Sequence, residues 1–156
     1  MRKFLALSIC LLLTCCCSEE LTPPEIDIKA SLLDPEAATV IEKAQLNVES
    51  LPTSMQAWQQ YGKLIHAHGL DEQAKLAYAY ANTLQQTSET TYLQALVCAD
   101  LGDYEQAITL CEEISTYTPA LWRQGYWLLD LGKLTQAKEM FDFAIAQDSS
   151  AVAAMV

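Results

Sequence analysis

Residues 101–119 read LGDYEQAITLCEEISTYTP, and this stretch decides the fold. Gly102 supplies a turn signal after a helix-like run, Tyr104 and Ala107 begin a second helical pattern, and Pro119 closes the stretch. Glycine commonly follows the last residue of a helix, whereas proline cannot continue one. The order of these residues therefore predicts two helices joined by a tight turn.

The same pattern recurs on both sides of this stretch. The turn glycines Gly69, Gly102 and Gly132 are 33 and then 30 residues apart. Each predicted hairpin also carries small residues where two helix backbones would approach closely. These small residues are Gly62 with Ala74, Ala95 with Ala107, and Gly125 with Ala137.

This recurring order resembles the tetratricopeptide repeat (TPR), a helix–turn–helix unit of about 34 residues. The resemblance covers residues 51–148. It implies an all-α, TPR-like right-handed superhelix of antiparallel helix pairs, with about three repeats plus an N-terminal helix. The residues that define the repeats are Trp58, Gly62, Gly69, Ala74, Ala81, Ala95, Gly102, Ala107, Pro119, Gly125, Gly132, Ala137 and Ala144.

Helix boundaries follow from the apolar spacing and from the cap signals. Asp103 followed by Gln106 predicts a capping box. The connection before the last hairpin is short, which predicts Pro119 as the first residue of its helix. We expect helices at residues 35–50, 54–68, 72–84, 89–101, 104–116, 119–131 and 134–146.

Residues 1–17 have the pattern of a signal peptide, with Arg2 and Lys3 before an apolar run at 4–13. As a helix, that run would cover about 15 Å, which is too short to span about 30 Å of hydrocarbon. Residues 18–33 are acidic and contain two prolines, so we expect a flexible linker before the helical domain at 34–148 and a short apolar tail at 149–156.

The sequence LLTCCC at residues 12–17 resembles the lipobox of bacterial lipoproteins. The resemblance implies a lipid (palmitate-type) on Cys16, with Cys15 and Cys17 as alternatives. It also implies attachment to the periplasmic face of the outer membrane, because no aspartate follows the cysteine. An ordinary secretory signal, with a free periplasmic product, is the alternative.

The TPR resemblance also implies a concave groove lined by the first helix of each repeat. A groove with aromatic and aliphatic residues would suit an apolar helix or extended peptide of a protein partner. The alternative is that these side chains pack internally, as we expect for Trp127. The groove positions are Gln59, Lys63 and His66, then Tyr92, Leu96 and Ala99, then Trp122, Tyr126 and Leu129.

Charge and motifs argue against several other functions. The net charge of −11 disfavours nucleic-acid binding, because phosphate would be repelled. No catalytic constellation or phosphate-binding loop is present, and His66 and His68 point to different sides of a helix. We therefore expect no enzyme activity, metal or cofactor.

Cys98 and Cys111 occupy facing positions in the central hairpin. They could form a disulfide in an oxidising periplasm or remain buried free thiols, and we favour free thiols because the helix spacing disfavours a bond. The sequence thus predicts a membrane-tethered scaffold or assembly accessory of the envelope, secretion or pilus type. Alternatives are a module for cytochrome or cofactor-protein maturation and a thiol-dependent redox factor, and the apolar tail could support self-association.

Overall fold

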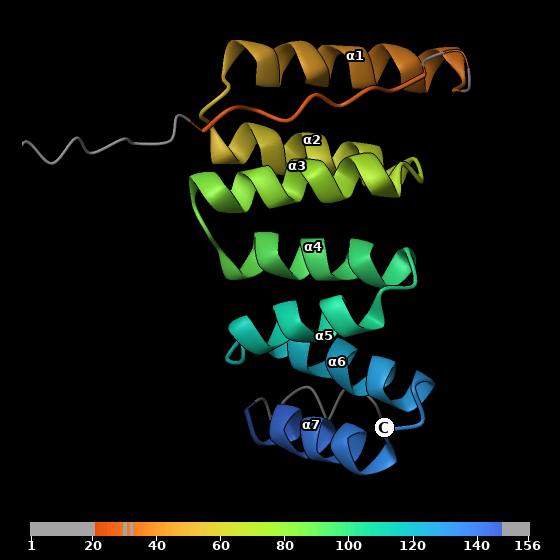
Figure 1. Cartoon of the computed structure of the whole chain (residues 1–156), viewed down its shortest axis with the longest axis vertical. Helices are drawn as coiled ribbons and strands as arrows, with labels where there is room; N and C mark the ends of the chain where they lie inside the picture. The colour runs from red at the N-terminus through yellow and green to blue at the C-terminus, as the bar shows by residue number, and fades with distance from the viewer. Residues whose placement is uncertain (1–20, 30, 32, 148–156) are drawn as a thin grey trace, which may run out of the picture.

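The computed structural model describes residues 21–29, 31 and 33–147, and the regular secondary structure within these residues is helical. Figure 1 shows the helices stacked across one long axis. Three antiparallel pairs (α2 with α3, α4 with α5, α6 with α7) follow α1, which confirms the predicted TPR-like superhelix with an N-terminal helix. The helices are α1 (Pro35–Ser50), α2 (Met55–Ala67), α3 (Asp71–Leu84), α4 (Ser88–Asp100), α5 (Tyr104–Glu113), α6 (Thr118–Asp130) and α7 (Leu134–Gln147).

The turns inside the three pairs share one geometry. Gly69, Gly102 and Gly132 have φ angles of 72°, 83° and 72°, a conformation that residues with a side chain rarely adopt. At the central turn, the Gly102 N–H donates to the Ala99 carbonyl at 2.9 Å and the Asp103 N–H donates to the Cys98 carbonyl at 2.8 Å. These are the paired bonds of a Schellman motif, so each turn reverses the chain within a few residues.

Two predicted details of the helix starts are wrong. Asp103 Oδ1 accepts from the Gln106 N–H at 3.1 Å, but Gln106 Oε1 accepts from the Cys98 thiol at 3.5 Å, so only half of the capping box forms. The preceding glycine turn already uses the Asp103 N–H, which leaves Gln106 without its reciprocal donor. Pro119 is the second residue of α6, after Thr118, and not the first. Proline fits at either position, because the amides of the first turn have no partner within the helix.

The small residues lie between helices, where the predicted close approach requires them. A Cβ atom on Gly62 would lie 2.6 Å from Cε1 of Tyr78 in α3. A Cβ atom on Gly125 would lie 2.5 Å from Cε1 of Phe141 in α7. In the central pair, Ala95 is fully buried. Each glycine therefore makes room for an aromatic ring from the second helix of its own repeat.

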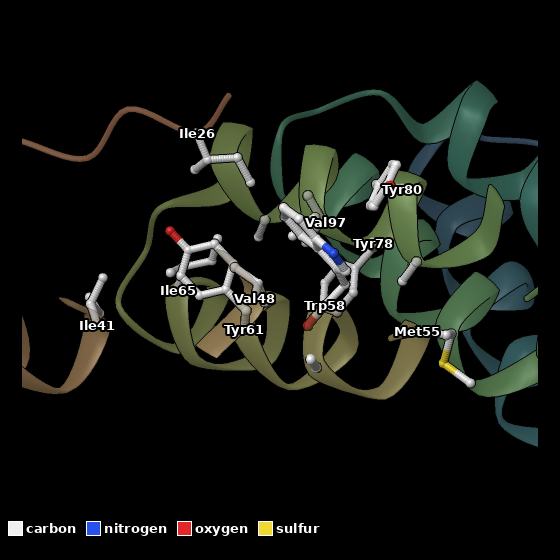
Figure 2. Packing of buried hydrophobic residues seen from close by; sticks show 14 residues of the cluster. Ile26, Ile41, Val48, Met55, Trp58, Tyr61, Ile65, Tyr78, Tyr80 and Val97 are labelled. Atoms are coloured by element: carbon white, nitrogen blue, oxygen red, sulfur yellow. The ribbon is translucent and has the colours of Figure 1, made fainter. Parts of the chain in front are cut away.

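The largest hydrophobic cluster is centred on α2 and α3. Ile65 and Tyr78 are fully buried and Tyr61 is almost so, while Trp58 packs edge-on against Tyr80 with ring centroids 4.9 Å apart. Figure 2 shows these side chains converging, with Ile26 above them. Because α1 and the segment before it cover this cluster, the amino-terminal half of the stack has a closed core.

Residues 21–29, which we call the strap, are not the flexible linker that the sequence predicted. They are extended and lie along α1 (Figure 1). Ile26 is only 8% exposed and Ile28 is half-buried, whereas the alternate positions Glu25 and Asp27 are exposed. Alternation is the signature of an extended segment with one buried face. The prediction failed because residues 18–33 contain few apolar residues, so Ile26 and Ile28 were not recognised as the buried face of an extended segment.

The predicted signal peptide, the lipidation candidates Cys15, Cys16 and Cys17, and the apolar tail at 149–156 lie outside the described residues. Within the described part, none of the helices is long and apolar enough to cross a membrane.

Candidate functional site: the inner face of the stack

The first helices of the three repeats line the inner face of the curve. Among the described residues, Cα atoms of α2 and α4, and of α4 and α6, lie within 8 Å of each other, whereas those of α3, α5 and α7 do not. Helices on the inside of a curved stack lie closer together than those on the outside. The inner face therefore consists of α2, α4 and α6, as the resemblance implied.

In the first repeat this face is closed by contacts to the next helix. Gln59 is only 7% exposed, and its Nε2 donates to Thr90 Oγ1 of α4 at 2.8 Å. The prediction that Gln59 faces an open groove is therefore wrong. Its position points toward the neighbouring repeat, and a buried amide needs a hydrogen-bond partner, which Thr90 supplies.

Two more predicted groove residues bridge α2 and α4. Lys63 Nζ lies 2.7 Å from Glu89 Oε1, and this hydrogen bond lowers the pKa of Glu89 below its ordinary value. His66 Nε2 lies 2.9 Å from Asp100 Oδ2. Both pairs are partly exposed, so they line the face but already have partners within the chain. A ligand would have to compete for them.

The second repeat contributes apolar surface that is partly covered. Tyr92 packs edge-on against Tyr117, the residue before α6, with ring centroids 5.5 Å apart. Leu96 is half-buried, and Ala99 is buried. These contacts join α4 to the start of α6 and leave only part of Tyr92 and Leu96 accessible.

The third repeat carries the most open part of the inner face. Trp122 and Tyr126 both pack on Phe141 of α7, with ring centroids 5.7 Å and 5.2 Å away. Tyr126 is nevertheless 45% exposed, and Leu129, three residues later on the same side of α6, is 40% exposed. Trp127, on another side of the helix, is buried as predicted. An aromatic and an aliphatic side chain thus stay accessible side by side.

The central cysteines are buried free thiols in the structure. Burial raises the pKa of the Cys98 thiol, and it raises the pKa of the Cys111 thiol to about 12. Redox-active cysteines need the opposite environment, one that favours the thiolate. This geometry does not fit a thiol-dependent redox factor.

Sequence reasoning missed the partners that close the first part of the face. Thr90, Glu89 and Asp100 all belong to α4, and no pattern within a single repeat marks them as partners of α2. Phe141 of α7, which packs on both Trp122 and Tyr126, was also not predicted as part of this face. Among the described residues, no cluster of three or more histidine, cysteine or acidic side chains could hold a metal ion.

Comparison with known proteins places the fold. No family model matches the sequence, and no curated protein matches it. Two crystal structures of MamA, a TPR protein, are similar to this structure, with TM-scores of 0.67 and 0.68. Sequence identity is 16% and 20%, and the matches cover 73% and 74% of this chain and 70% and 66% of the MamA chains. The helical order, the glycine turns and this likeness together give the chain a TPR-like fold.

Proposed function

We propose that this chain is a protein-binding scaffold or assembly accessory whose partner lies against the inner face at α4 and α6. The observation that carries the proposal is the pair Tyr126 and Leu129, exposed at 45% and 40% on a helix whose other sides are packed. Tyrosine combines a large apolar surface with a polar atom, which suits a binding hot spot.

The contacts within the chain also limit where the partner binds. Gln59, Lys63 and His66 are already engaged with α4, so the first repeat offers little unpaired polar surface. The partner's main contacts are therefore Tyr92, Leu96, Trp122, Tyr126 and Leu129. An apolar helix or extended peptide fits such a surface. A clamp for a terminal carboxylate does not, because Lys63 is paired with Glu89.

The proposal includes a place in the cell. The signal-peptide pattern of residues 1–17 and the lipobox-like cysteines support a lipid anchor at Cys16 on the periplasmic face of a bacterial outer membrane. More than one acyl chain gives a stable anchor, so the scaffold would meet its partner at the membrane. Envelope, secretion or pilus assembly needs scaffolds of this kind, and no enzyme activity is part of the proposal.

A photo-crosslinking amino acid at position 126 tests this function in intact cells. We expect a specific protein adduct from Tyr126, because its ring is accessible on the inner face. The matched control is Leu76 on α3, which is 47% exposed outside the inner face. Equal adducts from positions 126 and 76, or none from 126, would contradict the proposal.

A further inference from the structure

The strap is fixed to the stack by specific contacts at both of its ends. Tyr80 Oη donates to the Leu21 carbonyl at 3.3 Å, and Gln73 Nε2 donates to the Asp27 carbonyl at 3.4 Å. Between these two points, Ile26 belongs to the same hydrophobic cluster as α2 and α3. The strap therefore belongs to the folded body of the protein together with the helices.

The strap begins at one particular edge of the stack. Figure 1 shows its first residues beside the connection at residues 51–54, on the side of the stack that also holds the connections at 85–87 and 114–117, and we call this side the loop edge. The opposite edge contains the turns at Gly69 and Gly132, and we call it the glycine edge. The described part of the chain therefore begins at the loop edge.

Charge alone does not separate the two edges. The three connections of the loop edge read LPTS, QQT and ISTY and contain no charged residue. The helix ends beside them carry the exposed carboxylates Glu49, Glu112 and Glu113, and Glu89, which is paired with Lys63. The glycine edge carries Asp34, Glu36, Asp71, Asp100, Asp103 and Asp130, with Lys133 beside Gly132. The orientation of the protein at a membrane therefore depends on where the strap begins.

We propose that the strap holds the loop edge toward the bilayer surface and turns the glycine edge away. This inference rests on the proposed lipid anchor. From Cys16 to Leu21 there are five residues, which span at most about 18 Å when fully extended. Anchoring at Cys15 or Cys17 changes the limit to about 21 Å or about 14 Å. The partner of this edge is a lipid surface.

Lipid photo-crosslinking tests the orientation with the full-length protein. The lipidated protein is placed in vesicles of phosphatidylethanolamine and phosphatidylglycerol that contain a lipid with a photoactivatable headgroup. We expect crosslinked peptides from residues 51–54, 85–87 and 114–117, and few from the turns at Gly69, Gly102 and Gly132. The wild-type pattern is decisive even if a variant fails to fold.

Releasing the strap provides the matched comparison. Ile26→Asp should free residues 22–33 and lengthen the reach by about 40 Å, so the preference for the loop edge should be lost while the protein stays on the vesicles. Glu25→Gln, at an exposed neighbouring position, should keep the wild-type pattern. Vesicle binding with equal labelling of both edges would overturn this inference alone. Failure of the wild-type protein to bind vesicles would overturn the lipid anchor and, with it, this inference.

Discussion

The first and third repeats are built on the same plan but are packed very differently. In the first repeat, Tyr61, Ile65 and Tyr78 are buried under α1 and the strap. In the third repeat, α7 buries only Ala137 and Ala144, while Phe143 and Ile145 are 41% and 40% exposed.

This difference indicates that the first repeat contributes most to stability and that the third repeat offers the binding surface. Repeat proteins gain stability from the interfaces between neighbours, so a repeat covered on both sides is the firmest. The first repeat has α1 on one side and α4 on the other, and its inner face is closed by polar contacts. The third repeat keeps apolar side chains accessible, which is where we place the partner.

The largest expected effect comes from truncating the core at equivalent positions. Ile65→Ala should lower the free energy of unfolding by about 2–5 kcal/mol, because the fully buried site cannot collapse around the cavity. Leu128→Ala, the equivalent change in α6, should cost less because the neighbouring helix has room to move. Denaturant unfolding measures both, and a larger loss at Leu128 would reverse the comparison.

High pH should lower the stability of the protein through two buried tyrosines of the first repeat. Burial raises the pKa of Tyr61 to about 12 and that of Tyr78 in the same direction. In the unfolded chain tyrosine ionises near pH 10, so between about pH 10 and 12 the unfolded state binds fewer protons and stability falls as pH rises. For Tyr61 the loss reaches about 2 kcal/mol at pH 12. The free energy of unfolding, measured at pH 8, 10 and 11.5, should show this decrease, and Tyr61→Phe should make the decrease smaller. An equally large decrease in the Tyr61→Phe variant would refute the assignment of the effect to Tyr61.

A smaller effect is expected from filling the two glycine contacts. Gly62→Ala pushes a methyl group against the fully buried ring of Tyr78, which costs about 1–3 kcal/mol and outweighs the helix-propensity gain of about 1 kcal/mol. Gly125→Ala meets the half-buried ring of Phe141, which can shift toward solvent, so its net effect should be close to zero. Thermal unfolding of the two variants, compared directly, would contradict this account if Gly125→Ala were the more damaging.

The smallest effect is expected at Tyr78 itself. Its hydroxyl is buried and has no hydrogen-bond partner among the described residues. An unsatisfied buried hydroxyl is unfavourable, so Tyr78→Phe should leave stability unchanged or raise it by about 1 kcal/mol near neutral pH. A clear loss of stability in denaturant unfolding would show that the hydroxyl has a partner.

The fold could be predicted from the sequence because its signals are local. Glycine turns, small residues and apolar spacing act within one repeat, so the predicted helices begin and end within a few residues of those found. Contacts between repeats depend on how the superhelix curves, and sequence spacing does not report that. Gln59 was therefore placed in an open groove although it is bonded to Thr90, and the strap was predicted as a free linker although Ile26 is buried.

Co-purification of the natural partner with two double variants tests the central claim most directly. Both variants alter inner-face residues, and both should fold because the changed side chains are exposed or partly exposed. Tyr126→Ala with Leu129→Ala should abolish co-purification, whereas Lys63→Ala with His66→Ala should leave it nearly unchanged. Loss of the partner from the second variant, with retention in the first, would contradict a binding surface centred on α4 and α6.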